Sequence, residues 1–151
     1  MAELRRGDIT NFNGGNDVKV LGPYDCNNGI TNGDLVQLNT DGKVQRCATN
    51  ATAALGWAMN STTTDEDDVY VAWGGSAMCV MDVIAGQTIA ITDYGIHYEI
   101  IGTTSVQTFD KSATTSVLLS TVEIDVTNAL CNAYIIPSAL QPGIINTVSP
   151  A

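Results

Sequence analysis

The chain has 151 residues, a length typical of one compact domain with room for an appended arm or tail. With 6 lysines and arginines against 16 aspartates and glutamates, the net charge is -10. This balance argues against nucleic acid and anionic membranes as partners, because phosphate binding needs clustered cations. No apolar run reaches the roughly 18 residues of a membrane-spanning helix, and residues 1–8 lack the apolar stretch of a signal peptide.

Residues 1–17 differ in composition from the rest of the chain. Glycine, asparagine and aspartate are frequent there, and these residues favour turns and irregular backbone. The sizeable apolar groups in the segment are Leu4, Ile9 and Phe12, too few to hold it folded by itself. We interpret it either as a frayed terminus or as an extended N-terminal arm that becomes ordered against a partner, with those three side chains as anchors.

Residues 18–136 show short β-type runs at near-regular spacing, and no stretch of helical length has sustained helical apolar spacing. The expected strands are 18–21, 34–38, 43–47, 55–59, 68–73, 77–83, 88–92, 96–101, 122–126 and 130–136. An Asp-Gly turn between the second and third runs indicates a β-hairpin. Many short strands with glycine-rich turns predict an all-β domain, built as a small barrel or sandwich.

The side-chain period of two assigns faces within these strands. Val69, Val71 and Trp73 are expected on one face of their strand. The run 122–126 alternates apolar with acidic residues, as a half-buried strand does.

Two segments bear on the organisation of the chain. Residues 33–38 and 86–91 share an order of glycine, polar and β-forming residues, which two hairpins of similar build explain without a true repeat. Residues 137–151 are expected to form an irregular C-terminal tail, because prolines interrupt any β ladder there. This tail either packs on its own domain or reaches a neighbouring subunit.

The four cysteines, Cys26, Cys47, Cys79 and Cys131, lie far apart and form no CxxC pair. Because the chain also has a single histidine, a zinc site is not expected. We expect free thiols, mostly buried as small apolar groups, and no structural disulfide.

No catalytic constellation emerges from the motifs. The stretch 74–78 lacks the second glycine of a nucleophile elbow. His97 is expected on a strand without the orienting groups that a nucleophilic site needs. The acidic run 65–68 lacks the spacing of an EF-hand loop and is interpreted as a solvated turn. The sequence therefore predicts a protein that is not an enzyme and holds no cofactor or metal.

Three motifs resemble those of bacteriophage capsid decoration proteins, also called cement proteins. They are Gly33–Val36 (GDLV), Asp41–Val44 (DGKV) and Leu55–Ala58 (LGWA). In that family a Gly-Asp-x-Val strand, a short hairpin and a Gly-Val/Trp-Ala strand follow an extended N-terminal arm. The similarity covers roughly residues 17–100, and the C-terminal half carries no signature beyond its β pattern.

The resemblance implies a small β-barrel of the tulip-like or SH3-like kind. It implies homo-oligomers, most often trimers, made in the host cytoplasm and placed on the outer surface of a phage head. There they would clamp neighbouring major capsid subunits and stabilise the shell. Within the arm, Leu4, Ile9 and Phe12 are then expected to bind the capsid as apolar anchors, with Arg5 and Arg6 as charged contacts.

Two other classes of function remain open. A phage-tail or extracellular glycan-binding module would use Trp57, Trp73, Tyr94 and Tyr98 as an aromatic platform, although core packing is the simpler interpretation of both tryptophans. A hydrolase acting through acidic residues would need a carboxylate pair with perturbed pKa values in a cleft.

Overall fold

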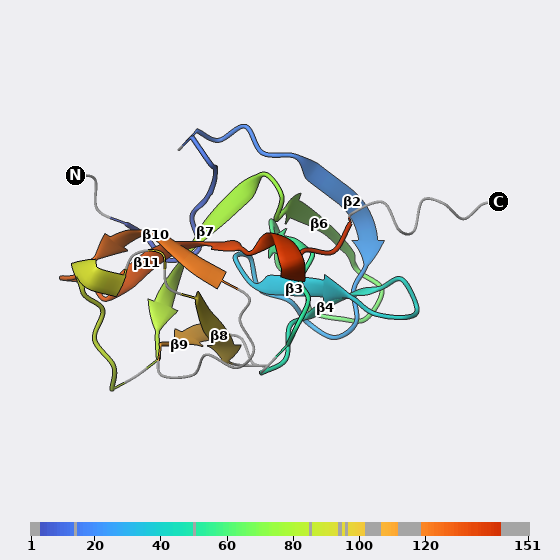
Figure 1. The fold of residues 1–151 in the computed structure, drawn as a ribbon. Helices are drawn as coiled ribbons and strands as arrows, with labels where there is room; N and C mark the ends of the chain where they lie inside the picture. The colour runs from blue at the N-terminus through green and yellow to red at the C-terminus, as the bar shows by residue number, and fades with distance from the viewer. Residues whose placement is uncertain are drawn as a thin grey trace.

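The computed structural model describes residues 4–13, 15–49, 51–84, 86–93, 95, 97–101, 107–111 and 119–142. Within these ranges the chain forms two β-sheets and no α-helix, which confirms the predicted all-β class (Figure 1). Sheet A contains β1 (Ile9–Asn11), β7 (Ala77–Val83), β8 (His97–Ile101), β9 (Thr108–Asp110), β10 (Leu119–Asp125) and β11 (Leu130–Ile135). Sheet B contains β2 (Val20–Asp25), β3 (Leu35–Leu38), β4 (Val44–Arg46), β5 (Gly56–Ala58) and β6 (Asp68–Trp73).

Sheet B is antiparallel throughout, in the order β2-β6-β5-β3-β4. The predicted hairpin is β3–β4, where Val36 lies opposite Arg46. An isolated bridge from Cys26 to Val44 joins the end of β2 back to β4. The sheet therefore curls around its own apolar cluster, which includes Tyr24, Cys26, Ile30, Val36, Leu38, Val44, Leu55, Ala58, Val69 and Val71.

The predicted face of β6 is confirmed by this cluster. Val69 and Val71 are fully buried in it, and Trp73 packs against it from the same side of the strand. The other face of β6 carries Ala72, which is buried against the core of sheet A. Alternate residues of one strand thus contribute to two separate apolar clusters.

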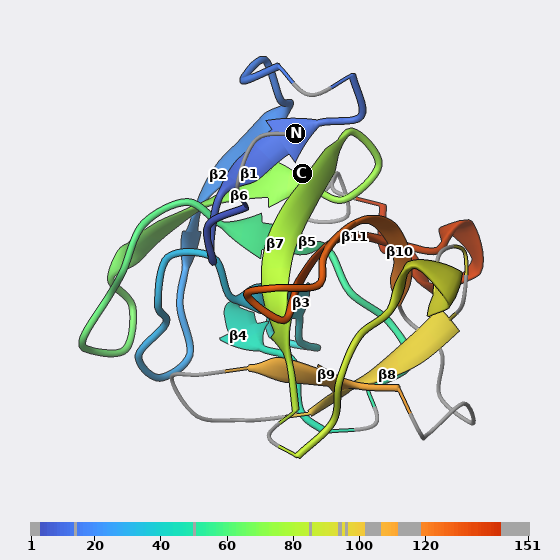
Figure 2. The same cartoon turned by 90° about the vertical axis from the view of Figure 1, so that its left-hand side faces the viewer.

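Sheet A has the order β1-β7-β11-β10-β8-β9, and β9 also pairs with β7 in parallel. These pairings close β7, β11, β10, β8 and β9 into a ring. In Figure 2, β1 lies at one end of β7 and β9 at the other. The ring encloses the apolar cluster that includes Cys79, Met81, Val83, Ile100, Phe109, Ile124, Cys131, Ala133 and Ile135.

Gln107 links the two sheets through a fully buried side chain, 1% exposed. Its Oε1 accepts the backbone N–H of Leu35 at 2.6 Å, and its Nε2 donates to the carbonyl of Leu35 at 3.1 Å. The same Nε2 donates to the carbonyl of Cys47 at 3.2 Å. The amide thereby satisfies the Leu35 N–H and the Cys47 carbonyl, and it adds a second donor to the Leu35 carbonyl, which also accepts the N–H of Cys47.

Three details of the predicted elements are wrong. Residues 88–92 form no strand and lead into a 3₁₀ turn, Ile91–Asp93, so 86–91 is not a hairpin equivalent to 33–38. Val126 lies beyond the end of β10 and is 52% exposed. The short strands β1 and β9 were not predicted, because three residues are too few to show a period of two.

The four cysteines are buried and free, as predicted. The first part of the expected C-terminal tail is held close to the domain. A 3₁₀ turn, Pro137–Ala139, leads into Leu140, which bridges to Ala54. Residues 143–151 lie outside the described ranges. No helix in the described parts is long and apolar enough to cross a bilayer.

Candidate interaction surface

Part of the N-terminal segment, Ile9–Asn11, forms strand β1 of sheet A. Ile9 lies opposite Cys79 in an antiparallel pairing with β7. The backbone N–H of Gly7, whose φ is 87°, donates to the carbonyl of Val80 at 3.0 Å, and the N–H of Val80 donates to the carbonyl of Asp8 at 3.1 Å. Two residues thus oppose one, which is a β-bulge. The expectation that this segment cannot order without a partner is wrong for these residues, because β7 supplies the missing hydrogen bonds.

Three of the five expected capsid-binding residues contact the domain itself. Arg6 Nε donates to Asp82 Oδ2 at 2.8 Å, and its guanidinium also donates to the carbonyl of Gln107 at 2.9 Å. Ile9 is half-buried against the core of sheet A. The backbone N–H of Leu4 donates to the carboxylate of Asp125. These contacts hold the segment in place and leave it little freedom to reach elsewhere.

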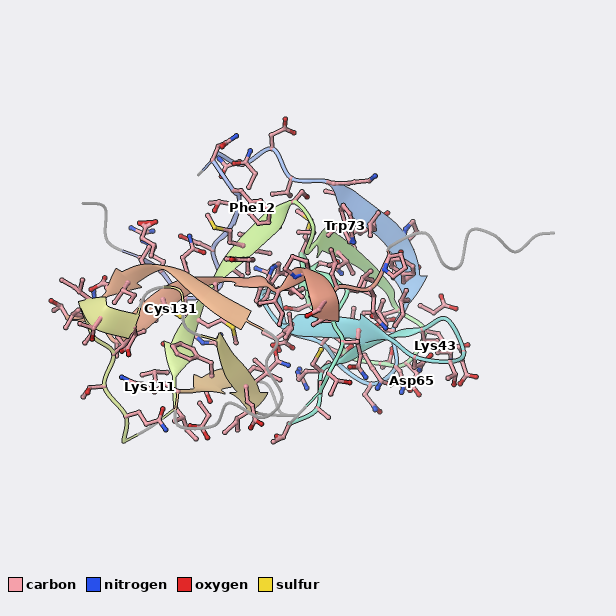
Figure 3. The ribbon with its side chains drawn as sticks, in the orientation of Figure 1. Phe12, Lys43, Asp65, Trp73, Lys111 and Cys131 are labelled. Atoms are coloured by element: carbon pink, nitrogen blue, oxygen red, sulfur yellow. The ribbon has the colours of Figure 1, made fainter. Side chains whose placement is uncertain are left out.

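The other two expected residues, Arg5 and Phe12, are exposed to solvent. Phe12 is 50% exposed and contacts the Tyr134 ring edge to face, with 5.8 Å between ring centroids and 65° between planes. In Figure 3, Phe12 lies above Cys131 and Lys111 lies below it. An aromatic pair of this kind buries part of each ring and leaves the remainder available to a partner.

Phe12 belongs to a larger surface, which we call the outer face of sheet A. The odd-numbered residues of β7 and β11 point into the ring, so the even-numbered residues point away from it. The register places Asn132 between Val80 on β7 and Glu123 on β10. The outer face therefore comprises Asp8, Thr10, Phe12, Met78, Val80, Glu123, Asn132 and Tyr134.

Several polar groups of the outer face have no hydrogen-bond partner. Thr10 Oγ1 and Asn132 Oδ1 are buried and unpartnered, and Asn132 is only 5% exposed. In the described part of the chain, Asp8 and Glu123 form no ion pair or side-chain hydrogen bond. A buried acceptor without a donor costs about 1–3 kcal/mol. The outer face thus gathers acceptors that a donor from another molecule could satisfy.

Asp125, at the border of the outer face, shows the contrasting case. Asn128 donates to its carboxylate from Nδ2 at 2.9 Å and from the backbone at 3.2 Å. These bonds lower the pKa of Asp125 below its usual value. Its hydrogen-bonding capacity is used within the chain, whereas that of Glu123, on the same strand, is not.

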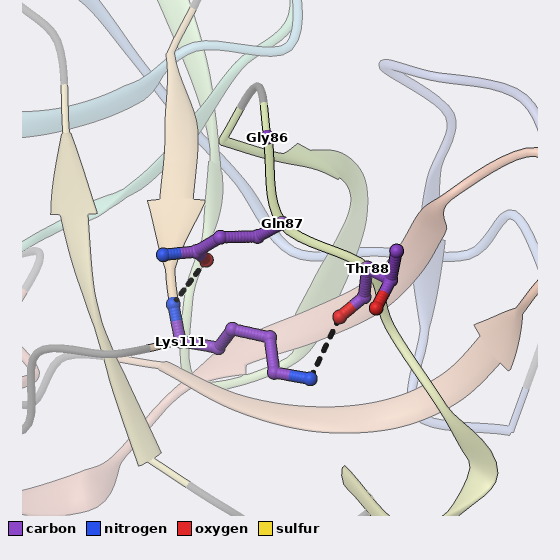
Figure 4. A pocket seen from close by; sticks show the side chains of 4 residues that line it. All are labelled: Gly86, Gln87, Thr88 and Lys111. Carbon is purple, nitrogen blue, oxygen red and sulfur yellow. Dashed lines mark hydrogen bonds between the residues drawn. The ribbon is translucent and has the colours of Figure 1, made fainter.

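A second candidate site is an open cavity of about 330 Å³ lined by Gly86, Gln87, Thr88 and Lys111 (Figure 4). The ammonium of Lys111 donates to the Thr88 carbonyl and to Asp93 Oδ2, both at 2.7 Å. The ion pair neutralises the only charged side chain of the lining. The cavity consequently offers little to an anionic ligand.

The residues considered for metal binding and catalysis are not gathered into a site. The acidic run is a turn in which Asp67 accepts the backbone N–H groups of Thr63 and Thr64, which lower its pKa. Among the described residues, no three His, Cys, Asp or Glu side chains lie close enough to hold a metal ion. His97 lies on β8, and its side chain is outside the described part.

The aromatic platform expected for glycan binding does not form as proposed. Trp57 is fully buried in the core. Trp73 is half-buried, donates from Nε1 to the Gln141 carbonyl at 3.1 Å and has Lys19 Nζ 5.6 Å from its ring centroid. Tyr94 and the side chain of Tyr98 lie outside the described residues. The aromatic pair of the exposed Phe12 and the half-buried Tyr134 was not predicted as a pair from the sequence.

No protein-family model matches this chain, and no curated protein matches it in sequence. Its function has to be argued from its own residues and from the motif resemblance.

Proposed function

We propose that the chain is a structural virion protein that binds the outer surface of a bacteriophage head and clamps neighbouring major capsid subunits. The observation that carries the proposal is the placement of the three decoration-type motifs. The first leads into β3, the second forms the β3–β4 turn, and the third contains β5, which pairs with β3. Motifs separated in sequence thus lie side by side in sheet B.

The motif residues have structural roles that account for their identity. Asp34 is buried and forms an ion pair with Arg46, whose Nε lies 2.6 Å from Asp34 Oδ2. Gly33 has a φ of 92°, and a Cβ there would lie 3.0 Å from Gly7 Cα. The motif therefore packs directly against the N-terminal segment, the element that precedes it in the resembling family.

The clamping mechanism would be mass action. A protein that binds only the expanded lattice stabilises it by its binding free energy. Homo-oligomers, most often trimers in the resembling family, would engage several capsid subunits at once, so that weak contacts add up through effective concentration. The outer face is the surface we assign to these contacts. Of the five arm residues expected to bind the capsid, Phe12 is retained as the exposed apolar anchor.

The test is co-sedimentation of the purified chain with expanded heads that lack it, taken from the phage that encodes it, followed by electron microscopy. We expect saturable binding at fixed lattice positions. Phe12→Asp should abolish binding while leaving thermal unfolding unchanged. Ile91→Asp is the matched control, because Ile91 is also exposed, at 68%, but lies off the outer face. Absence of saturable binding to expanded heads would contradict the proposal.

A further inference from the structure

We infer that the outer face of sheet A binds an arginine side chain of a protein partner, in front of β11 and between Glu123, Asn132 and Tyr134. In naming a capsid subunit as the source of that arginine, the inference rests on the proposed function. The recognition chemistry itself depends only on the described residues, so it can be tested without a capsid.

The register brings the three side chains together. Asn132 is paired with Glu123 on the neighbouring strand, beside a β-bulge between Thr121 and Glu123, so the two residues are neighbours across the strands. Tyr134 follows Asn132 by two residues on the same strand and face, about 6.6 Å along β11. A guanidinium is wide enough to meet a carboxylate and an amide oxygen at this spacing, because its five N–H donors lie in one plane.

The unmet hydrogen bonds indicate a donor as the missing partner. Asn132 Oδ1 is buried and unpartnered, and no hydrogen bond within the described chain holds either end of the amide. The amide oxygen therefore lacks a donor, which an incoming group would supply once the terminal amide turned its oxygen toward that group. Glu123, half-buried beside it, supplies the negative charge and has no cation of its own among the described residues.

The aromatic pair favours arginine over lysine. A planar guanidinium stacks on an aromatic face while its edge donates hydrogen bonds, which an ammonium group cannot do. Phe12 packs edge to face against Tyr134 and limits the positions open to that ring. The side chain that would stack on the guanidinium is therefore held in place before binding.

The chain does not fill this site with its own N-terminal arginines. Arg6 is bound to Asp82 and to the carbonyl of Gln107. Arg5 is exposed and forms no ion pair with a described carboxylate. The net charge of -10 also favours approach of a cationic segment from a partner.

The experiment is a titration of the isotope-labelled full chain with N-acetyl-arginine amide, followed by NMR. We expect saturable shifts with a dissociation constant in roughly the millimolar range, as for a single side chain. They should be largest at the Asn132 side-chain amide and the Tyr134 ring. N-acetyl-citrulline amide, which has the same shape without the charge, should bind at least about fivefold more weakly.

Two variants separate a built site from general charge attraction. Glu123→Gln should weaken arginine binding about fivefold or more. Asp41→Asn removes the same charge from an exposed position in the β3–β4 turn of sheet B, away from the outer face, and should change binding by less than about twofold. Equal weakening by the two variants, equal affinity for N-acetyl-lysine amide, or shifts spread over the whole chain would each overturn the inference. If arginine binds as described but heads do not, the inference stands and the proposed function fails.

Discussion

Sheet B curls around an apolar cluster of its own, whereas the cluster inside the ring of sheet A also includes Leu35, Trp57 and Ala72 from sheet B, and the two sheets close in different ways. Within sheet B, the pairs β3–β4, β3–β5 and β5–β6 join segments that are near in sequence. Sheet A depends on β7, which pairs with β1, β11 and β9 from distant parts of the chain. Sheet B thus has one distant pair, β2–β6, whereas sheet A adds to its local pairs β10–β11 and β8–β9 three distant pairs that all involve β7.

The two sheets also differ in how they use polar groups. Sheet B pairs its buried Asp34 carboxylate with Arg46, and its one unpartnered buried group among the described residues is the donor Trp57 Nε1, which lies in the core. Sheet A leaves acceptors on its outer face unpartnered, including Asn132 Oδ1. In the proposed function, sheet B is the scaffold that carries the three sequence motifs, and sheet A presents the proposed binding surface. The following predictions test that division, beginning with the scaffold.

Gly56→Ala should cause the largest loss of stability, because β5 and β6 approach closely at this glycine. A Cβ at Gly56 would lie 2.0 Å from the carbonyl oxygen of Ala72, so the backbone itself must move. We expect a loss of about 5 kcal/mol in the free energy of unfolding, measured by denaturant titration. Gly86→Ala is the control, since its φ is 90° but no atom lies within 4 Å. It should cost about 1 kcal/mol, and a similar cost at both positions would contradict the tight packing of sheet B.

Alkaline pH should destabilise the protein through the buried thiols. Burial raises the pKa of Cys79 to about 12, and it also raises the pKa values of Cys47 and Cys131. Unfolded thiols ionise near pH 8.5, whereas the native ones stay protonated. Their stabilisation is therefore complete below that pH and is lost as pH rises toward the native values. We expect a loss of about 4 kcal/mol between pH 8 and roughly pH 9.5.

Cys79→Ala separates this thiol effect from other alkaline titrations. The variant should lose about 1.4 kcal/mol less than the parent over the same pH interval. An unchanged pH dependence would show that Cys79 ionises in the native ring of sheet A. Because all four cysteines are free, a reductant should not change the melting temperature of either protein.

Gln107→Leu should cost about 3 kcal/mol, because it strips partners from buried backbone groups of Leu35 and Cys47. Gln141→Leu is a matched variant. Gln141 binds the N–H of Leu38 at 2.8 Å and its carbonyl at 3.2 Å in the same two-bond manner, but it is only half-buried. Water can replace its bonds, so we expect about 1 kcal/mol. Equal losses in the free energy of unfolding would mean that the hydrogen bonds of Gln107 stabilise the fold no more than those of Gln141.

The difference between the sheets also explains what the sequence could predict. In sheet B, strands β3 to β6 follow from local patterns and an Asp-Gly turn, and all were predicted. In sheet A, the long strands β7 and β11 were predicted, but their pairing with Ile9–Asn11 and Thr108–Asp110 was not. Pairing between distant segments depends on which edge remains open after the rest has folded, and no local pattern records it.

The candidate surface was predicted only in part. Phe12 was singled out because it is one of only three sizeable apolar residues in the segment 1–17, and it is exposed. Arg6 and Ile9 were assigned to a partner, yet they contact the chain itself, because their acceptor and their apolar neighbours come from β7. Faces were not assigned within 130–136 from the sequence, although a period of two there puts Asn132 and Tyr134 on the face opposite Cys131.

The smallest expected effect concerns the ion pair that joins the N-terminal segment to β7. Arg6 and Asp82 lie 2.8 Å apart, but their side chains are 30% and 35% exposed, so water and salt weaken the attraction. A double-mutant cycle with Arg6→Met and Asp82→Asn should give a coupling energy of about 0.5 kcal/mol. The bond from Arg6 to the Gln107 carbonyl is lost in both backgrounds and cancels in the cycle.

Raising the salt concentration to about 1 M should remove most of this coupling, because the Debye length then falls to about 3 Å. A coupling energy above about 2 kcal/mol that persists in salt would mean that charge holds the segment to β7. The expected small value leaves the β1–β7 hydrogen bonds and the half-buried Ile9 as the contacts that hold it. In that case Phe12 and the outer face are supported by backbone pairing, as a strand of sheet A requires, and a partner that binds there meets an ordered surface.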